Sequence, residues 1–407
     1  MDLLINGIEN KLIKKSIQVS GSKSESNRLL VLQQLFSNLE IKNLSDSDDT
    51  HHMQECLASN DVKRNIGHAG TTMRFLTAYF ASRNEGEVEL SGSDRMHDRP
   101  IKILVDALKD LGAKISYVEK EGYPPLKIIG GGIINSEVSV LGNVSSQYIS
   151  ALLLIAASLP EGLKINLIGK ITSIPYLQMT LALMNQVGID TSFEEQIIKV
   201  LPVRSIFTKT IVVESDWSSA SYFYSIIALS DIGSEIQLSA YKKDSLQGDS
   251  ILVDIYKHFG VDTVFRNDFI TLKKSGETSK ELLELNLIKA PDITQTIAVT
   301  CFALKVPCFL TGLHTLKIKE TDRLIALETE LSKLGALISV TEDTLEIKVS
   351  EIINKNISIE TYNDHRMAMA FAPLAIQVPI TIKDAKVVTK SFISFWENLK
   401  EIGFQYQ

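Results

Sequence analysis

The chain has 407 residues, of which 44% are hydrophobic and 22% charged, and its net charge is −7 at pH 7. This length predicts two domains, and the acidic balance argues against nucleic acid or an anionic membrane as a general partner. The three cysteines, Cys56, Cys301 and Cys308, have neither metal-ligand nor disulfide spacing, so we expect no metal site and a cytoplasmic location. The N-terminus lacks the pattern of a signal peptide, and the longest apolar run, residues 149–160, is too short to span a bilayer.

A polar loop near the N-terminus leads directly into an apolar helix. Residues 1–19 are expected to form two short strands, and Gly21–Arg28 precedes the apolar residues from Leu29 onward. Backbone N–H groups at a helix start lack intrahelical partners and carry partial positive charge, while Lys23 and Arg28 add full charges. The stretch predicts a phosphate or carboxylate site, although a capped helix with solvated charges fits it equally well.

The next segment combines acidic residues with two adjacent histidines. Asp46, Asp48, Asp49, His51 and His52 could suggest a metal site. Adjacent histidines cannot share one helix face, so we expect instead that Asp48 or Asp49 caps a helix that begins at Thr50.

A run of three glycines, Gly130–Gly132, separates two short apolar segments. The run lacks the GxGxxG spacing and does not open a helix. We therefore interpret it as a hairpin turn rather than a nucleotide-binding loop.

One pattern recurs along the whole chain. A loop of small or hydrogen-bonding residues opens a largely apolar helix near residues 21, 69, 145, 216, 292 and 364. A helix that is apolar all round must be buried on every side, so each repeat predicts one helix inside, one half-buried helix outside and a sheet between them. Two groups of three repeats give an α/β fold with one domain at residues 20–213 and another at residues 1–19 and 214–407.

Basic residues lie at or near the starts of these helices, namely Lys23, Arg28, Arg74, Lys319, Arg323 and Arg366. If the buried helices point their N-termini at a gap between the domains, each terminus favours an anion there by about 0.3–1 kcal/mol. Such a cleft would suit a pair of substrates with several negative charges.

Several short segments are distinctive: Gly21–Ser24 with Asn27–Arg28, Ala69–Arg74, Arg99–Pro100, Ser145–Gln147, Pro291–Asp292, Lys319–Arg323 and Asn363–Met369. In this order they resemble segments of the 5-enolpyruvylshikimate-3-phosphate synthase family, and the match covers essentially the whole chain. The Lys-Glu-Thr-Asp-Arg and Asp-His-Arg-Met-Ala stretches are the specific ones.

The resemblance implies two inside-out, barrel-like α/β domains, each of three repeated units with parallel buried helices and the sheets outside. It implies transfer of the enolpyruvyl group of phosphoenolpyruvate to the 5-hydroxyl of shikimate 3-phosphate, with release of phosphate, in aromatic amino-acid biosynthesis. It further implies that no metal or organic cofactor is needed, that the partners are the two small substrates, and that the chain acts as a monomer.

The resemblance also implies roles for individual residues. Those expected to bind shikimate 3-phosphate are Lys23, Ser24, Arg28, Ser145, Ser146, Gln147, Ser173, Tyr176, Asp292, Thr315 and Lys319. Those expected to bind phosphoenolpyruvate are Lys23, Gly70, Arg99, Gln147, Glu320, Arg323, His365, Arg366 and Lys390. Asp292 resembles the group that takes the 5-hydroxyl proton, Glu320 the group that handles the methylene proton, and Lys23 the cation that touches both substrates.

The chemistry of the reaction fits these residue types. Addition of a hydroxyl to an enol ether needs one proton delivered and one removed, which two carboxyl groups in different environments can divide. Lys319 and Arg323 are four residues apart, so we expect them on one helix face with Glu320 beside them.

Three positions depart from the family pattern. His68 and Thr315 stand where asparagine is common, and Ile174 replaces a common basic residue. These departures affect the expected geometry of the shikimate site rather than the reaction. Gly70 is kept, so the resemblance implies sensitivity to glyphosate, a phosphonate that occupies the phosphoenolpyruvate site in this family.

Other interpretations compete with this one. The related UDP-N-acetylglucosamine enolpyruvyl transferase uses a reactive loop cysteine, whereas Cys56 here lies within an expected helix and is interpreted as packing. A phosphosugar-binding module on the same fold is a non-enzymatic alternative. Individually, Asp292 could be a helix cap and His365 a packed core residue.

Overall fold

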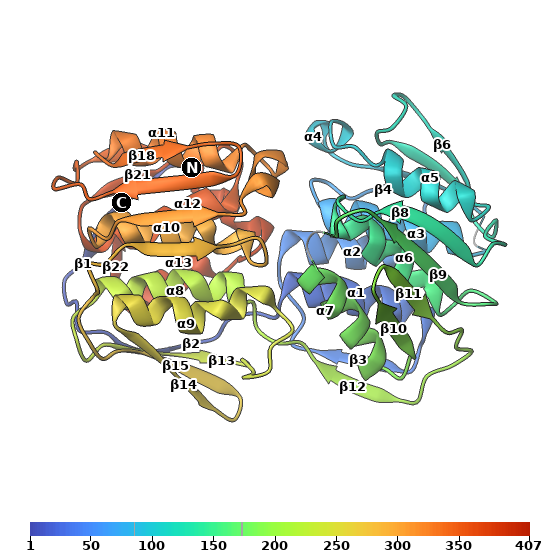
Figure 1. Cartoon of the computed structure of the whole chain (residues 1–407), viewed down its shortest axis with the longest axis horizontal. Coiled ribbons are helices and arrows are strands. Elements are labelled where there is room, and N and C mark those ends of the chain that lie inside the picture. Colours follow the sequence, from blue (N-terminus) through green and yellow to red (C-terminus); the bar gives the residue numbers. More distant parts are fainter. Residues whose placement is uncertain (85, 172–173) are drawn as a thin grey trace. The chain divides into compact units, whose positions relative to one another are not determined.

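The computed structural model describes residues 1–84, 86–171 and 174–407, and it divides into two compact units (Figure 1). Unit 1 is Met1–Ser20 with Glu214–Gln407, and unit 2 is Gly21–Val213. Ser20 belongs to unit 1, where its carbonyl accepts a hydrogen bond of 3.2 Å from the backbone N–H of Asp216. Among the described residues, no helix has both the length and the apolar character that crossing a membrane requires.

Unit 2 contains helices and strands in alternation. Its helices are α1 (Lys23–Leu35), α2 (Asp48–Ala58), α3 (Gly70–Ser82), α4 (Asp94–His97), α5 (Lys102–Asp110), α6 (Ser146–Ala156) and α7 (Ile174–Gln186). Its strands are β3 (Leu39–Lys42), β4 (Lys63–Asn65), β5 (Glu87–Ser91), β6 (Lys114–Tyr117), β7 (Leu126–Ile129), β8 (Glu137–Leu141), β9 (Leu163–Ile168), β10 (Thr191–Glu194), β11 (Ile197–Val200) and β12 (Lys209–Val212).

Unit 1 is built from the same kinds of element. Its α-helices are α8 (Trp217–Leu229), α9 (Leu252–Ile255), α10 (Thr294–Ala303), α11 (Arg323–Lys333), α12 (His365–Phe371) and α13 (Phe395–Ile402). Its 3₁₀ helices are η1 (Gly248–Ile251), η2 (Tyr256–Phe259), η3 (Pro291–Ile293), η4 (His314–Ile318), η5 (Ala372–Ile376) and η6 (Ala385–Lys390). Its strands are β1 (Leu3–Ile8), β2 (Lys14–Ile17), β13 (Glu235–Ser239), β14 (Val261–Arg266), β15 (Phe269–Lys274), β16 (Leu283–Asn286), β17 (Cys308–Thr311), β18 (Leu337–Val340), β19 (Thr344–Lys348), β20 (Ile357–Ile359), β21 (Ile380–Ile382) and β22 (Phe404–Tyr406).

The four-stranded sheets of the described residues share one topology. Their strand orders are β4-β5-β7-β6, β8-β9-β11-β10, β2-β13-β15-β14, β16-β17-β19-β18 and β20-β21-β1-β22. In each, the first two strands are parallel and every later pair is antiparallel. The strands β3 and β12 form a separate parallel pair. This recurrence confirms the α/β class with repeated units that the helix spacing predicts.

The parallel pairs show how the chain passes between the units. Each of α3, α6, α10 and α12 connects the two strands of one parallel pair. By contrast, α1 connects β2 to β3 and α8 connects β12 to β13, yet β2 pairs with β13 and β3 with β12. At each crossing, the strand before the helix and the strand after it therefore belong to different units. β2 pairs with β13 inside unit 1 and β3 pairs with β12 inside unit 2, so a parallel ladder holds each strand in its own unit.

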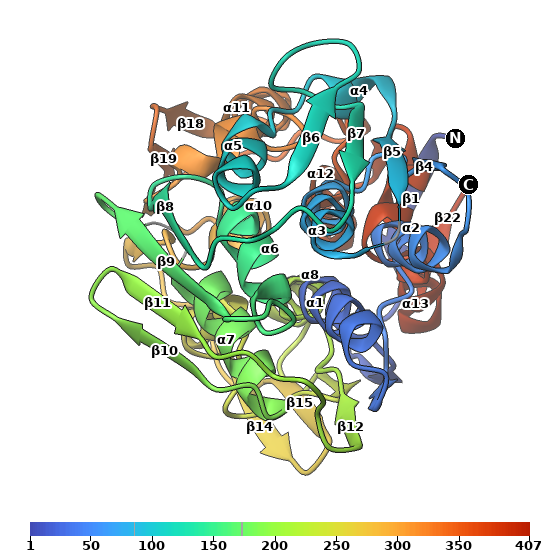
Figure 2. The same cartoon turned by 90° about the vertical axis from the view of Figure 1, so that its right-hand side faces the viewer.

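The inner helices are buried because their sequences leave no polar face. All ten residues of α10 are buried, and Thr300 satisfies its hydroxyl by donating to the carbonyl of Thr296 at 2.7 Å. In unit 2, α1, α3 and α6 pack against one another with the strands outside them (Figure 2). In unit 1, α8 and α12 both pack against α10.

The outer helices have one apolar stripe each. In α5, Leu104, Val105 and Leu108 are buried at the spacing of one helix face, whereas Lys102 and Lys109 are exposed. These outer helices pack directly against the inner ones, α5 against α3 and α6 and α11 against α10, while alternate residues of strands such as β7 are exposed. The expectation that a sheet separates an inner from an outer helix was therefore wrong.

Two local expectations were wrong. Ser47, not Asp48 or Asp49, caps α2, because its hydroxyl accepts a hydrogen bond from the backbone N–H of Thr50. The glycine run 130–132 is no hairpin turn, because β7 and β8 belong to different sheets. Its glycines are needed for close packing, since a Cβ on Gly130 would lie 1.9 Å from the carbonyl oxygen of Arg83.

We expect Gly21→Ala to destabilise the protein by about 1–3 kcal/mol, the usual cost of overpacking. The added Cβ would lie 1.8 Å from the carbonyl oxygen of Asn43 and 2.9 Å from Val213 Cγ1. Urea unfolding followed by circular dichroism measures the effect. Gly276→Ala is the matched control, because nothing lies within 4 Å of the added atom. Equal unfolding midpoints for the two variants would contradict the packing argument.

Candidate functional site

A buried arginine organises the polar residues of unit 1. Arg323 is 1% exposed and begins α11. Its guanidinium donates to Asp364 Oδ2 at 2.7 Å, to Asp292 Oδ1 at 3.0 Å and to Glu320 Oε2 at 2.9 Å. Burial alone would lower the pKa of Arg323, but these three carboxylates raise it above its ordinary value. One cation thereby joins three separate segments of the chain.

Asp292 is shared among three cations. Besides the Arg323 contact, Asp292 Oδ1 lies 3.6 Å from Lys319 Nζ, and Asp292 Oδ2 lies 3.1 Å from Arg366 Nη2. Asp292 lies in η3, immediately before α10, and its side chain is 16% exposed. The residue is therefore an ion-paired group at the start of a buried helix rather than the cap of that helix, whose N-cap position is Ile293.

The sequence placed Lys319 and Arg323 on one helix face, and this was wrong. Helix α11 begins only at Arg323, because Asp322 caps it by accepting from the backbone N–H groups of Leu324 and Ile325. Lys319 lies in the non-helical segment between η4 and α11, at the C-cap position of η4. Asp292, rather than helix periodicity, brings Lys319 and Arg323 together.

The loop before α12 holds an uncommon backbone conformation. Tyr362 and Asn363 have φ of 53° and 54°, in the left-handed region that few non-glycine residues adopt. Lys390 Nζ donates to the carbonyl of Asn363 at 2.7 Å, and Asp364 caps α12 by accepting from the N–H of Arg366 at 2.9 Å. His365 is buried, with Nδ1 lying 3.8 Å from Asp364 Oδ1.

In unit 2 the starts of α1 and α3 meet at one carboxylate residue. Lys23 Nζ lies 3.5 Å from Asp49 Oδ2, and Thr72 donates its hydroxyl to the Asp49 carbonyl at 3.0 Å. The starts of α3 and α6 are joined in turn, because Gln147 Nε2 donates to Thr71 Oγ1 at 3.2 Å. The N-termini of the three buried helices of unit 2 therefore lie together.

Gly70 lies directly against the guanidinium of Arg99. A Cβ on Gly70 would lie 2.5 Å from Arg99 Nη1 and 2.7 Å from Nη2. The neighbouring Arg74 is buried and donates to the carbonyls of Gly70 and Pro100. It thereby links the two segments that carry Gly70 and Arg99. Burial and the nearby Arg99 charge lower the pKa of Arg74 to about 10. Only a glycine lets Arg99 approach the start of α3 so closely.

The serines predicted to hold a phosphate lie at the start of α6. Ser145 is the N-cap and accepts from the N–H of Gln147, and Ser146 is the first helical residue. A helix start with hydroxyl groups suits an anion. Ser173, the third predicted serine, lies outside the described residues.

Arg28 lies below the surface of unit 2. It is 2% exposed and donates to Thr180 Oγ1 at 2.7 Å, to the Ser24 carbonyl at 2.8 Å and to Ser150 Oγ at 3.3 Å. The Tyr176 carbonyl accepts a further hydrogen bond at 3.5 Å. Burial lowers the pKa of Arg28 to about 10. The structure thus places Arg28 beside Ser24 and Tyr176, and its contact with a substrate stays a prediction.

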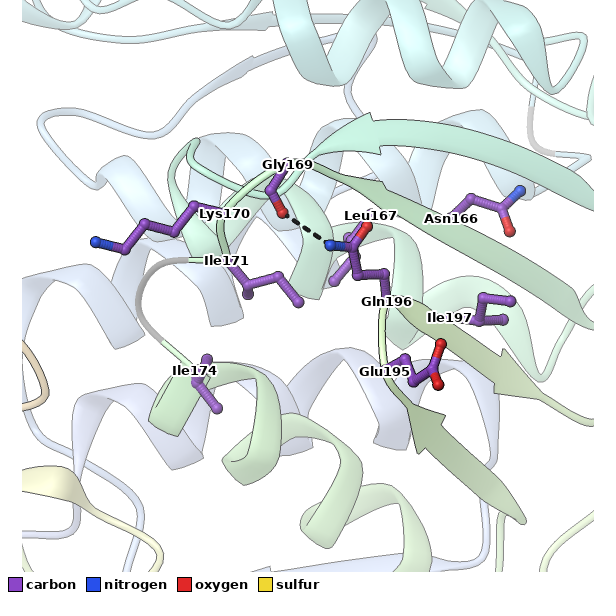
Figure 3. Close-up of a pocket in the computed structure, with 9 residues that line it drawn as sticks. All are labelled: Asn166, Leu167, Gly169, Lys170, Ile171, Ile174, Glu195, Gln196 and Ile197. Carbon is purple, nitrogen blue, oxygen red and sulfur yellow. Dashed lines mark hydrogen bonds between the residues drawn. The ribbon is translucent and has the colours of Figure 1, made fainter.

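Two further features concern Thr315 and the surroundings of Ile174, both of which depart from the family pattern. Thr315, in η4, has a buried Oγ1 with no hydrogen-bond partner among the described residues. In unit 2, a pocket of about 670 Å³ lies between β9, β11 and the start of α7, lined by residues that include Lys170, Ile174 and Gln196 (Figure 3). Gln196 Nε2 donates to the Gly169 carbonyl across it, as the dashed line in Figure 3 marks.

The structure therefore brings the predicted residues together as two groups, one inside each unit. Sequence reasoning gave no site role to four residues that help to position them. Asp49 pairs with Lys23, Asp364 pairs with Arg323, Ser218 accepts from Arg366, and Asp249 accepts from Ser218. Each of the four lies at or near the start of a helix. The segments that contain them were recognised as helix entries, but which side chains would meet there depends on the packing of the units.

Comparison with known proteins assigns the chain to a family. The model of the family EPSP synthase (3-phosphoshikimate 1-carboxyvinyltransferase) matches residues 54–399. A 3-phosphoshikimate 1-carboxyvinyltransferase of Bacteroides fragilis is 45% identical over 397 residues, covering 96% of each chain. One from Actinobacillus succinogenes is 36% identical over 429 residues, covering 96% of this chain and 97% of its own. This chain belongs to the EPSP synthase family.

Solved structures agree on the fold. EPSP synthase from Acinetobacter baumannii superposes with a TM-score of 0.81 at 21% identity, with 100% of both chains covered. The enolpyruvyl transferase NikO from Streptomyces tendae gives 0.74 at 14% identity, covering 100% of this chain and 98% of NikO. The fold class and the resemblance to the EPSP synthase family predicted from the sequence are both confirmed.

We expect Arg323→Met to destabilise the protein by about 3–5 kcal/mol, because it leaves buried carboxylates without their cation. The side chain of Asp364 is 0% exposed and would lose its partner at 2.7 Å. Lys383→Met is the control, since Lys383 pairs with Asp2 at the surface and such pairs contribute at most about 1 kcal/mol. Chemical unfolding measures both. The expectation fails if Arg323→Met unfolds at the same denaturant concentration as the control.

Proposed function

We propose that this chain transfers the enolpyruvyl group of phosphoenolpyruvate to the 5-hydroxyl of shikimate 3-phosphate and releases phosphate. Membership of the EPSP synthase family supports this reaction. The structural observation that supports it most is the arrangement around Asp292, where two arginines and a lysine surround one carboxylate next to Glu320. We further propose that a single chain without a metal or organic cofactor performs the reaction in the cytoplasm.

The two groups of residues suit different parts of this chemistry. Unit 2 offers Lys23, the Gly70–Arg99 contact and the serine-capped start of α6, which suit phosphate and carboxylate groups. Unit 1 offers two carboxyl groups that can exchange protons, Asp292 and Glu320, together with their cations. We propose that both groups act on the same pair of molecules.

Substrate binding would change the environment of Asp292. In the structure, Asp292 lies 3.1 Å from Arg366 Nη2 and 3.6 Å from Lys319 Nζ. An incoming phosphate or carboxylate therefore competes with Asp292 for these two cations. Once those contacts pass to the substrate, Asp292 is available to accept the proton of the 5-hydroxyl. For the addition, Glu320 has to carry a proton as its carboxylic acid. The 5-hydroxyl oxygen bonds to C2 of phosphoenolpyruvate, its proton passes to Asp292, and Glu320 delivers its own proton to the methylene carbon.

The tetrahedral intermediate carries a carboxylate and a phosphate on one carbon. The next step breaks its C–O bond to phosphate and removes a methyl proton, which restores the enol ether in the product. Glu320 can take that proton back, the proton held by Asp292 leaves with the phosphate, and the cations stabilise the departing phosphate. Arg323 holds Glu320 and Asp292 on one guanidinium, so the two proton-transfer groups keep a fixed separation throughout.

The related reaction of UDP-N-acetylglucosamine enolpyruvyl transferase fits less well. Cys56 is buried in α2, where its Sγ donates to the Asn65 carbonyl at 3.7 Å. Burial raises the pKa of the Cys56 thiol to about 11, which disfavours the reactive thiolate. A non-enzymatic binding module remains a distinct alternative that the following assay separates.

Measuring phosphate released from phosphoenolpyruvate tests the proposal. We expect continuous release when shikimate 3-phosphate is present and none with UDP-N-acetylglucosamine in its place. Tight binding of shikimate 3-phosphate without phosphate release would instead favour the binding module.

We expect Asp292→Asn to lower kcat by about two orders of magnitude, the usual contribution of a general base. The amide keeps the shape of the side chain, so shikimate 3-phosphate should still bind with similar affinity by calorimetry. Asp343→Asn, at an exposed carboxylate that contacts His314, is the control. Near-normal turnover of Asp292→Asn would remove Asp292 from the proton-transfer role.

We expect Gly70→Ala to raise the KM for phosphoenolpyruvate by about tenfold, because displacing Arg99 loses a charge-assisted hydrogen bond worth roughly 1.5–3 kcal/mol. The KM for shikimate 3-phosphate should change little. Steady-state phosphate release with each substrate varied in turn measures both constants, and the open position Gly276→Ala is again the control. An unchanged KM for phosphoenolpyruvate would show that Arg99 does not bind it.

A further inference from the structure

Asp249 is a buried carboxyl group in unit 1 to which the sequence motifs assign no role. It lies in η1 and is 6% exposed. Its Oδ2 accepts a hydrogen bond from Ser218 Oγ, and Ser218 Oγ accepts one from Arg366 Nη2 at 3.3 Å. A single hydroxyl thus connects Asp249 to an arginine that we propose binds the phosphoenolpyruvate anion.

Two contacts of the Arg366 guanidinium are made by one nitrogen, Nη2. Its Nη2 donates to Ser218 Oγ at 3.3 Å and forms an ion pair with Asp292 Oδ2 at 3.1 Å. Arg366 Nε is buried and has no hydrogen-bond partner among the described residues. The two contacts at Nη2 restrain the guanidinium, and Nε stays a donor that no described residue uses.

Asp249 determines the direction of the Ser218 hydroxyl. A serine hydroxyl rotates freely unless a strong acceptor fixes its proton. Because the proton points to Asp249, the lone pairs of Ser218 Oγ face the N–H of Arg366. Without Asp249 the hydroxyl is free to rotate, and its lone pairs are no longer held toward Arg366.

The side chain of Gln247 fixes the loop that precedes Asp249. Gln247 Oε1 accepts from the N–H of Trp217 at 2.9 Å, and Gln247 Nε2 donates to the carbonyl of Ser215 at 3.0 Å. The loop before Asp249 is therefore fastened to the start of α8, where Ser218 lies. Such a fixed loop positions a side chain without help from a substrate.

We propose that Asp249, acting through Ser218, is a positioning residue that orients the Arg366 guanidinium toward the anionic donor substrate. The inference rests on the proposed function, in which Arg366 binds phosphoenolpyruvate. It adds Ser218 and Asp249 to the group that forms the unit 1 part of the site.

The charges around Asp249 give this role a pH dependence. Burial raises the pKa of Asp249 to about 7, the Asp292 and Asp216 charges also raise it, and Arg366 and the Ser218 hydrogen bond lower it. As the pH rises through this range, Asp249 becomes ionised and places another negative charge beside the donor site. We therefore expect the KM for phosphoenolpyruvate to rise with pH in the natural protein.

Steady-state kinetics of four variants test the inference. We expect Ser218→Ala and Asp249→Ala to raise the KM for phosphoenolpyruvate about tenfold, which corresponds to ~1.4 kcal/mol, with kcat within about threefold. The KM for shikimate 3-phosphate should not change. Asp249→Asn keeps an acceptor for Ser218 without the charge, so its KM should match the natural protein near pH 6 and stay lower near pH 8. Asp244→Asn, at an exposed position of the preceding loop, is the control.

The outcomes separate the inference from the proposed function. A KM for phosphoenolpyruvate within twofold of the natural value in Ser218→Ala, or an unaltered pH dependence in Asp249→Asn, overturns the role of Asp249 even if Asp249→Ala fails to fold. A natural protein that releases no phosphate overturns the proposed function instead. Calorimetric titration of phosphoenolpyruvate into the same variants then still tests whether Asp249 orients Arg366.

Discussion

The unit 1 site depends on one desolvated cation. Arg323 is almost completely buried, and the three carboxylates around its guanidinium compensate the charge that burial removes from water. Its partners come from three segments, at Asp292, Glu320 and Asp364, so the same ion pairs that make its burial tolerable also fix the positions of the two proposed proton-transfer groups. In the proposed mechanism, stability and chemistry therefore rest on the same contacts, so we expect a substitution at Arg323 to affect both.

The architecture supplies helix starts where these polar groups can gather. Helices such as α10 are buried on every side, so their sequences can hold charged residues only at their ends. In unit 1 the starts of α8, α10 and α12 are joined through Ser218, Asp292 and Arg366. In unit 2 the starts of α1, α3 and α6 are joined through Asp49, Thr72 and the Gln147–Thr71 hydrogen bond. Each unit thus gathers one group of polar residues at the starts of its buried helices, with a different set of charged residues in each unit.

Much of this organisation could be predicted from the sequence, because it follows from local patterns. The buried helices can be recognised in the sequence because they lack a polar face, and the stretch from Lys319 to Arg323 indicates the EPSP synthase family. Contacts set by tertiary packing could not be predicted. The separation of Lys319 from α11 depends on the cap made by Asp322, and the path through Gly130 depends on which sheet each flanking strand joins. The contact between Asp249 and Ser218 joins segments 31 residues apart, and neither residue alone suggests it.

The central claim is that the polar groups of both units act on one pair of substrates. A crystal structure of the chain with shikimate 3-phosphate and glyphosate tests it most directly. The account predicts that the glyphosate phosphonate or carboxylate is contacted by Lys23 or Arg99 of unit 2 and, in the same complex, by Arg323 or Arg366 of unit 1. A complex in which residues of one unit alone contact both ligands would contradict it.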